Sequence, residues 1–342
     1  MLVLSHEDLL KAGCFNIPMA LSVVEATFGK YAKGEVLFPD KVSQIFRQET
    51  QERINCLPAT ILTEKVCGMK WVAVFPPNPT RHHLPNLNAT ILLSEIETGF
   101  PIAVMDGTLC SDLRTASISA VAAKYLARKD SEVIGFLGAG EQAKMHLLTM
   151  RHVLPSLKVC KVASRRKESE ERFIRQMADI LPDMQFVPCD SEYEKAASDS
   201  DVVITAISAQ LPLLQAEWLG EGVFYCHVGG WEDDYAVPLS VDKIVTDDWH
   251  SVKHRTQTIS RLYQMGKLKD EDIYGDLYEI VVGTKKGRTS EKEKIYFNGV
   301  GLSYMDIALA YEFYKKAEGR ECISLEILKE SVFDDVRQYI VL

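Results

Sequence analysis

The sequence predicts an α/β protein in which a doubly wound parallel sheet follows an α+β domain. From residue 132 to about residue 248, short runs rich in β-branched residues alternate with stretches of helical composition. Six such runs with helical connections are typical of a parallel sheet that carries helices on both faces. The runs cover 133–137, 159–164, 184–188, 202–207, 223–228 and 243–246, and the helical stretches include 141–152 and 168–180.

The region before residue 118 has a different pattern. A helix is predicted over 17–31, and the extended segments 53–57, 68–75, 89–94 and 101–106 after it indicate a mostly antiparallel sheet. The alanine-rich stretch 111–128 then favours a long helix that bridges the two domains.

A second glycine cluster, 297–306, precedes a predicted helix over 307–317. It either returns the chain to the cleft between the domains or forms a simple tight turn. We place the first domain at 1–118, completed by about 307–342, and the second at 119–306.

A glycine motif opens the second domain. After the apolar run 133–137 come Gly138, Gly140 and Ala143, and then a helical pattern begins. In a dinucleotide-binding βαβ unit, the first glycine permits the tight turn and the second lets the backbone approach a pyrophosphate. The small third residue lets the helix pack against the strand. We therefore expect a Rossmann domain with cofactor contacts that include Glu141 and Gln142. A plain structural turn is the alternative.

The end of the next run indicates which nucleotide is bound. NAD enzymes usually carry Asp or Glu here for the ribose hydroxyl, whereas this chain has Ser164, Arg165 and Arg166. An arginine pairs well with a 2′-phosphate through two parallel hydrogen bonds. We predict NADP(H) in preference to NAD(H), which stays possible. In the alternative, these are solvated residues at the start of a helix.

Composition excludes several classes of protein. The chain is 46% hydrophobic and 25% charged, with a net charge of −9, which argues against binding to nucleic acid or to anionic membranes. No apolar run reaches the roughly 20 residues of a membrane span. The eight cysteines are scattered without a Cys-x-x-Cys pair, which favours reduced thiols in the cytoplasm. No histidine or cysteine spacing suggests a metal site.

Longer motifs resemble the family of ornithine cyclodeaminase and mu-crystallin, which includes an archaeal type of alanine dehydrogenase. The resemblance covers nearly the whole chain and is most specific over 101–116 and 122–128, with further similarity at 68–71, 78–81 and 299–302. It implies a homodimer formed through the N-terminal domain and an active site in the cleft between the domains. It also implies a nicotinamide cofactor and a small α-amino or α-imino acid substrate.

In this family, basic residues hold the substrate carboxylate, and Lys70 and Arg114 match those positions. Lys41 and Arg53 are further candidates. An arginine in an otherwise apolar helix needs an anion, so Arg114 binds either the substrate or a structural carboxylate such as Asp106 or Asp112. If burial lowers its pKa, Lys70 also suits acid–base chemistry. The alternative is a strand lysine that faces solvent.

The sequence departs from the family after the fifth run. Ornithine cyclodeaminases carry a Gly-Asp pair there whose Asp acts on the substrate amine, whereas this chain has Trp231 followed by Glu232 and Asp233. We expect a neighbouring carboxylate to take over, with Glu232 favoured over Asp233. This change resembles the branch that forms 2,3-diaminopropionate from an amino-acid conjugate. The remaining expected cofactor contacts are Thr115, Thr205, Ala206, Ile207, Val228, Gly229, Gly301 and, near the nicotinamide end, Asp306.

Together these features predict an NAD(P)-dependent oxidoreductase that acts on the C–N bond of an α-amino acid or its imine. Hydride transfer would join the α-carbon and the nicotinamide ring. Two alternatives stay open: conversion of ornithine to proline and ammonia, and NADPH binding without turnover, as in mu-crystallin.

Overall fold

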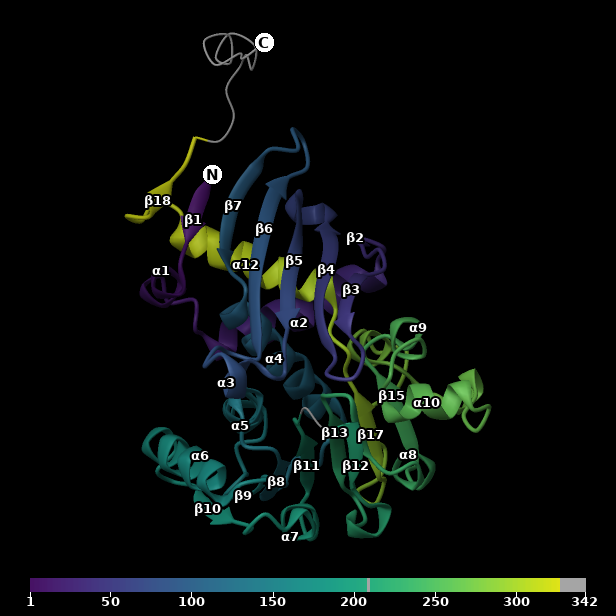
Figure 1. The fold of residues 1–342 in the computed structure, drawn as a ribbon. Coiled ribbons are helices and arrows are strands. Elements are labelled where there is room, and N and C mark those ends of the chain that lie inside the picture. The colour runs from purple at the N-terminus through teal and green to yellow at the C-terminus, as the bar shows by residue number, and fades with distance from the viewer. Residues whose placement is uncertain (208–209, 327–342) are drawn as a thin grey trace, which may run out of the picture.

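Two large sheets dominate the fold, one in each half of the molecule (Figure 1). The structure is a computed structural model and describes residues 1–207 and 210–326. Within these residues, no helix is both long and apolar enough to cross a membrane.

The sheet of the N-terminal half is antiparallel except where β1 runs parallel to β7. Its order is β18-β1-β7-β6-β5-β4-β2, and β3 also pairs with β4. The mostly antiparallel pairing agrees with the expectation from the sequence. The strands are β1 (Leu2–Leu4), β2 (Val36–Leu37), β3 (Val42–Arg47), β4 (Glu52–Ile61), β5 (Val66–Val74), β6 (Leu87–Glu95), β7 (Pro101–Asp106) and β18 (Ile323–Ser324).

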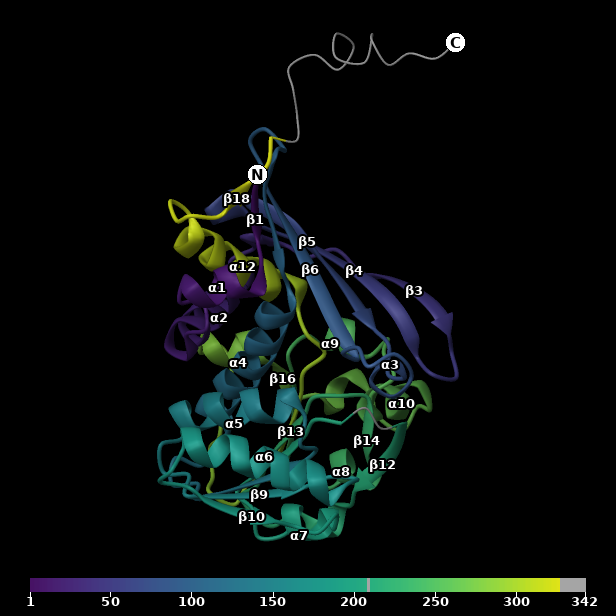
Figure 2. The same cartoon turned by 60° about the vertical axis from the view of Figure 1, so that its left-hand side comes forward.

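Helices gather on one face of this sheet (Figure 2). They are α1 (His6–Lys11), α2 (Ile17–Ala32), α4 (Thr108–Leu126) and α12 (Ser303–Ala317). The last of them, α12, comes from the C-terminal part of the chain and contacts β4, β5 and β6. The rest of the segment expected to complete this half, 327–342, lies outside the described residues.

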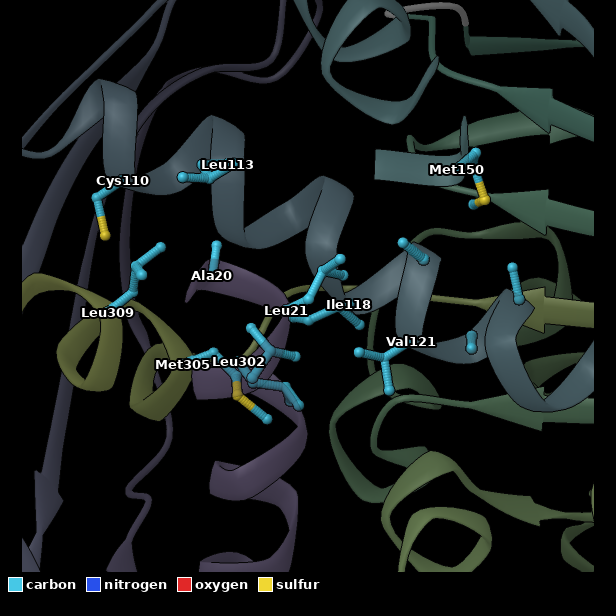
Figure 3. Packing of buried hydrophobic residues seen from close by; sticks show 14 of the residues in the cluster. Ala20, Leu21, Cys110, Leu113, Ile118, Val121, Met150, Leu302, Met305 and Leu309 are labelled. Atoms are coloured by element: carbon cyan, nitrogen blue, oxygen red, sulfur yellow. The ribbon is translucent and has the colours of Figure 1, made fainter. Parts of the chain in front are cut away.

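Helix α4 connects the two halves. It begins three residues before the predicted helix because the Asp106 carboxylate accepts hydrogen bonds from the backbone N–H groups of Thr108 and Leu109. In Figure 3 its side chains, among them Leu113 and Ile118, lie in one cluster with side chains of α2 and α12. The position of Arg114 on this helix is therefore fixed by close packing.

The second sheet is wholly parallel and confirms the predicted fold class. Its order is β10-β9-β8-β11-β13-β17-β15-β16. It contains the six predicted runs and two further strands, β16 and β17. The strands are β8 (Val133–Leu137), β9 (Val159–Ala163), β10 (Gln185–Pro188), β11 (Val202–Thr205), β13 (Phe224–His227), β15 (Lys243–Thr246), β16 (Gly275–Asp276) and β17 (Ile295–Asn298).

The connections of this sheet are only partly helical, so the expectation of a helix after each run was wrong. Between β11 and β13 the chain forms β12, which pairs with β14 after β13, and a 3-10 turn. The connecting elements are α5 (Glu141–Val153), α6 (Lys167–Ile180), α7 (Tyr193–Ala197), β12 (Gln210–Leu214), β14 (Trp231–Asp233), α8 (Ala236–Leu239), α9 (Trp249–Val252), α10 (Thr258–Gln264) and α11 (Leu277–Val281).

The strand order reverses between β8 and β11. From β8 the chain proceeds outward through β9 and β10, and then returns to β11 on the other side of β8. Ligands of open parallel sheets bind at the carboxyl ends of the strands at such a switch point. The ligand position expected from this rule, called here the crevice, lies beyond Leu137 and Thr205 at the carboxyl ends of β8 and β11.

Candidate active site

The turn after β8 has the geometry that a dinucleotide requires. Gly138 has φ +119°, and a Cβ there would lie 2.5 Å from the Ala206 carbonyl oxygen, so only glycine fits. Gly140 precedes α5, and a Cβ added to it would meet nothing within 4 Å. Ala143 is fully buried in the first turn of α5. The N-terminus of this helix therefore faces open space, where a phosphate is favoured.

The turn after β9 exposes two cations. The carboxylate of Glu170 is buried and points back into the turn, where it accepts hydrogen bonds from the backbone N–H groups of Ser164, Cys189, Asp190 and Ser191. Arg165 and Arg166 are exposed, and within the described residues neither is in an ion pair. The loop thus presents two cations, while the carboxylate of Glu170 is already bonded to backbone.

Glu232 ties together the loops on the other side of the switch point. Its Oε1 accepts from the Ile207 backbone N–H at 2.7 Å, and its Oε2 accepts from the Thr205 hydroxyl at 2.7 Å and the Gly229 N–H at 2.8 Å. Burial raises the pKa of Glu232 to about 7, although these hydrogen bonds act in the opposite direction. This single carboxylate fixes the loops that follow β11 and β13.

Asp233 belongs to the same buried polar network. It accepts a hydrogen bond from Thr258 at 2.5 Å and lies 3.2 Å from His227 Nδ1, which in turn lies 2.6 Å from the Tyr296 hydroxyl. Burial raises the pKa of Asp233 to about 8. Within the described residues, neither Asp233 nor Glu232 is bonded to Lys70 or Arg114, so these contacts favour a structural role over the catalytic one expected from the sequence.

The substrate half of the site is built around Asp306. Its Oδ1 accepts from Lys70 Nζ at 2.8 Å and from Arg114 Nε at 2.7 Å, and Lys70 Nζ is also 3.2 Å from the Ser111 hydroxyl. The side chains of Lys70, Arg114 and Asp306 are at most 8% exposed. The partner of Arg114 is thus neither Asp106 nor Asp112. Asp306, which was expected near the nicotinamide end of the cofactor, holds both cations.

This arrangement leaves bonding groups available. Asp306 Oδ2 is buried without a partner in the described structure. The Arg114 guanidinium lies against Gly301, where an added Cβ would be 2.6 Å from Nη1 and the backbone has φ +84°. Burial and the Arg114 charge lower the pKa of Lys70 to about 8, while Asp306 acts to raise it. Near neutral pH, Lys70 can therefore both hold and release a proton.

The other predicted residues lie around these two centres. Lys41 and Arg53 are half-buried, and burial together with Arg255 and Arg53 lowers the pKa of Lys41 to about 7. Thr115 donates to the Ser111 carbonyl, Gln142 Nε2 donates to Asp112 Oδ1 at 2.7 Å, and Glu141 is exposed and pairs with Lys144. Ala206 and Val228 follow β11 and β13 at the border of the crevice.

Sequence reasoning missed several members of the site. Asp247 accepts hydrogen bonds from the backbone N–H groups of Val300 and Gly301, both at 2.9 Å, and so holds the second glycine loop. Asp247 directly follows the predicted run 243–246, so its position at the carboxyl edge of the sheet could have marked it from the sequence. Ser111 lies one helical turn before Arg114, and Arg255 lies in a loop where no sequence pattern marked it.

The residues present fit a dinucleotide cofactor. The Asn298 side chain is fully buried at the carboxyl end of β17, and neither its Oδ1 nor its Nδ2 has a partner among the described residues. Such orphaned groups are rare unless a ligand or water satisfies them. Together with the open start of α5, they suit a polar ligand that lies along the sheet edge. The described residues contain no cluster of His, Cys, Asp and Glu that suits a metal ion.

The fold and this site define a two-domain α/β protein whose dinucleotide crevice opens beside a buried lysine, arginine and aspartate. The chain belongs to the ornithine cyclodeaminase/mu-crystallin family, whose model matches residues 12–321.

Relatives from several sources match almost the whole chain. Alanine dehydrogenase of Archaeoglobus fulgidus is 33% identical over 92% of this chain and 95% of its own length. N-((2S)-2-amino-2-carboxyethyl)-L-glutamate dehydrogenase of Staphylococcus aureus is 28% identical, covering 93% and 96%. Among solved structures, Δ1-pyrroline-2-carboxylate reductase of Thermococcus litoralis with NADH and L-proline has a TM-score of 0.88 at 30% identity, covering 93% and 97%. An archaeal alanine dehydrogenase dimer with bound NAD has a TM-score of 0.87 at 31% identity, covering 96% and 99%.

The role of Glu232 can be tested by Glu232→Gln. At pH 5 Glu232 is protonated, and glutamine replaces its hydroxyl oxygen with an NH2 group that can only donate toward the backbone N–H groups around it. We therefore expect the free energy of unfolding at pH 5 to fall by about 1 to 3 kcal/mol. Because folding raises the pKa of Glu232, ionising it costs stability as the pH rises from about 4.5 through 7. Glutamine does not ionise, so the variant does not lose this stability. The difference in the free energy of unfolding between the wild type and Glu232→Gln, measured by urea titration, should therefore be smaller at pH 8 than at pH 5.

The same variant separates structure from catalysis. We expect the Kd of the cofactor to rise, while kcat at saturating cofactor and substrate changes less than about tenfold. A loss of kcat by roughly 10² to 10⁴ with unchanged unfolding would instead identify Glu232 as a general base.

Proposed function

We infer that this chain is an NAD(P)-dependent oxidoreductase that acts on the C–N bond of an α-amino acid or its imine. The observation that carries this inference is the buried Lys70–Asp306–Arg114 cluster beside the dinucleotide crevice. Relatives that match nearly the whole chain are named as amino-acid dehydrogenases and an imino-acid reductase. The family and the cluster therefore point to the same chemistry.

The substrate carboxylate has a defined place in this proposal. Arg114 uses Nε to bond Asp306, which leaves the Nη1 and Nη2 end of its fork for a bidentate contact with the carboxylate. Lys70 Nζ bonds Asp306 and Ser111, which leaves its third N–H for the same ligand. Asp306 fixes both cations, so the α-carbon is oriented before reaction, and orientation supplies much of the rate.

Proton transfer falls to Lys70 and Asp306. A lysine with a pKa of about 8 can give a proton to the substrate nitrogen in reduction and take one in oxidation. The unpartnered Oδ2 of Asp306 is an acceptor for the N–H of the amine or iminium.

A nicotinamide cofactor supplies hydride donation or acceptance when bound. Gly138, Gly140 and the N-terminus of α5 would hold its pyrophosphate, and Asn298 and the loops fixed by Glu232 would border its nicotinamide end.

We further propose that NADP(H) is preferred over NAD(H). Support comes from the two exposed arginines after β9 and from the inward direction of the Glu170 carboxylate, which is bonded to backbone and so is not offered to a ribose 2′-hydroxyl. A 2′-phosphate would satisfy these cations.

A paired substitution tests this preference. Changing Arg165 and Arg166 together to Gln should raise the Kd of NADPH by about tenfold or more, since charge-assisted hydrogen bonds are lost, and should change the Kd of NADH less than twofold. Lys167→Gln is the matched control, because Lys167 already pairs with Asp190 at 2.9 Å. Tighter binding of NADH than NADPH by the wild type would refute the preference.

We also propose a cytoplasmic homodimer built through the N-terminal half. All eight cysteines are free, as is typical of a reducing compartment. Val42, Ile45 and Phe46 on β3 expose apolar surface, which commonly marks an interface. In this proposal the substrate and dimerisation domain is 1–118 with α12, and the cofactor domain is 119–306.

The pH dependence of turnover tests the assignment of Lys70. In the direction of reduction the protonated lysine is required, so kcat/KM should fall as the pH rises through about 8. Asp306→Asn removes the anion that raises this pKa and should move the descending limb to lower pH. Arg114→Gln removes a cation that lowers it and should move the limb to higher pH. Reductions of Δ1-pyrroline-2-carboxylate and of pyruvate with ammonia are suitable assays.

Lys70→Arg provides the control for this experiment. Arginine keeps the positive charge and does not titrate in this range. The residual kcat/KM of this variant should therefore not fall as the pH rises through about 8. If both neighbouring variants shifted the limb in the same direction, or left it in place, Lys70 would not be the titrating group.

A further inference from the structure

Helices α4 and α5 lie side by side in Figures 1 and 2, and polar side chains cross their contact. On α4 the contact uses residues 112, 116 and 119, and on α5 it uses residues 142, 146 and 149. Each set has the spacing i, i+4, i+7, so it lies on one face of its helix. These contacts are called here the α4–α5 hydrogen bonds. They join Gln142 Nε2 to Asp112 Oδ1 at 2.7 Å, Ser119 Oγ to His146 Nε2 at 2.9 Å, and Thr149 Oγ1 to the Ala116 carbonyl oxygen at 3.2 Å.

His146 is held in a single tautomer. Its Nδ1 lies 2.7 Å from the Gln142 carbonyl oxygen, which can only accept, so Nδ1 carries the proton. Nε2 is then the acceptor, and the Ser119 hydroxyl donates to it at 2.9 Å in preference to the Thr115 carbonyl at 3.3 Å. Burial lowers the pKa of His146 to about 4, so the imidazole stays neutral near pH 7. One arrangement of donor and acceptor therefore fits this contact.

The α4–α5 hydrogen bonds lie in an otherwise apolar surrounding. Ser119 is 3% exposed, and His146 and Thr149 are fully buried. The same two helices contribute apolar residues to the hydrophobic core, among them Ala120, Ala123, Ala143, Leu147 and Met150. Apolar contacts are non-directional, so small side chains allow one helix to shift along the other, whereas a buried donor and acceptor must meet. A shift by one residue, about 1.5 Å, would separate them. The hydrogen bonds therefore select one register of the two helices.

Each of the two helices carries one ligand contact of the proposed function. Arg114 lies two residues after Asp112 on α4 and would hold the substrate carboxylate. Helix α5 begins directly after Gly140, and its N-terminus would hold the cofactor pyrophosphate. The distance between these two contacts depends on the register of the helices. Hydride transfer requires the α-carbon and the nicotinamide ring to meet in one geometry, and a misplacement of about 1 Å can slow a reaction roughly 10²-fold.

We propose that the α4–α5 hydrogen bonds set the position of the substrate relative to the cofactor, with Ser119 and His146 as the central positioning residues. This inference rests on the proposed function. Within the described residues, neither side chain is bonded to Lys70 or Arg114, so both act through the helices and take no part in proton or hydride transfer. Gln142, expected to contact the cofactor, uses its side-chain N–H for the same interhelix contact.

A double variant, Ser119→Ala with His146→Leu, removes the central hydrogen bond without leaving either partner unsatisfied. Replacement of both partners by apolar groups is often nearly neutral for stability, so the midpoint of urea unfolding should stay close to that of the wild type. Stopped-flow absorbance at saturating NADPH and Δ1-pyrroline-2-carboxylate should show hydride transfer slowed by about tenfold or more, because the register is no longer specified. The Kd of NADPH, measured by calorimetry, should change less than about threefold, because the start of α5 is intact.

Amide hydrogen exchange reports on the same contact without turnover. In the NADPH-bound double variant, peptides that cover 108–126 and 141–153 should exchange at least about threefold faster than in the wild type, because the two helices open locally more often. Peptides of β9 and β10, which lie outside this contact, should exchange at the wild-type rate.

Ser117→Ala is the matched control. It removes a hydroxyl from the same helix, but Ser117 Oγ donates to the Leu113 carbonyl at 2.7 Å within α4, so hydride transfer should stay within about twofold of the wild type. The single variant Ser119→Ala should slow hydride transfer, and this pair decides the question even if the double variant does not fold. His146→Gln offers an amide oxygen to the Ser119 hydroxyl and should slow hydride transfer less than the double variant does.

The positioning role and the proposed reaction can fail separately. Hydride transfer in the double variant within about threefold of the wild-type rate, or unchanged exchange of the α4 and α5 peptides, would overturn the positioning role. An equal loss of rate in Ser117→Ala and Ser119→Ala would overturn it as well. A wild type that oxidises or reduces none of the probes would refute the proposed reaction, whereas the exchange of the two helices would still test the contact between them.

Discussion

The site depends on one buried carboxylate that is shared by two cations. Asp306 lies on α12, Lys70 on β5 and Arg114 on α4, so the ion pairs join three elements that are distant in sequence. Breaking such a buried arrangement leaves an uncompensated charge, which is strongly destabilising. The arrangement therefore requires α12 to return to the N-terminal sheet. It also brings the cation of β5, Lys70, and the cation of α4, Arg114, to the same carboxylate.

Two other buried carboxylates shape the crevice by holding backbone. Glu232 fixes the loops after β11 and β13, and Asp247 fixes the glycine loop after β17. In each case the carboxylate accepts backbone N–H groups that would otherwise lack partners. Ligand-binding loops are thus held rigid without secondary structure of their own. Burial raises the pKa of both groups to about 7.

Local sequence signals predicted the elements and much of the cofactor half. The apolar run before Gly138 and the composition of α4 report on neighbours a few residues away, and the structure has both. The partners across the cleft were not predictable in this way. Asp306 is 192 residues from Arg114, and no local pattern pairs them. Glu232 was predicted to be catalytic from its position after the fifth run, but its hydrogen bonds to two converging loops could not be predicted in this way.

A structure of the protein with NADP⁺ and a bound amino acid would test the central claim most directly. The account predicts that the α-carboxylate contacts Nη1 or Nη2 of Arg114 and Nζ of Lys70, while Asp306 Oδ1 keeps its bonds to Arg114 Nε and Lys70. An α-carboxylate bound away from Arg114, or an Asp306 side chain that has left both cations, would contradict it.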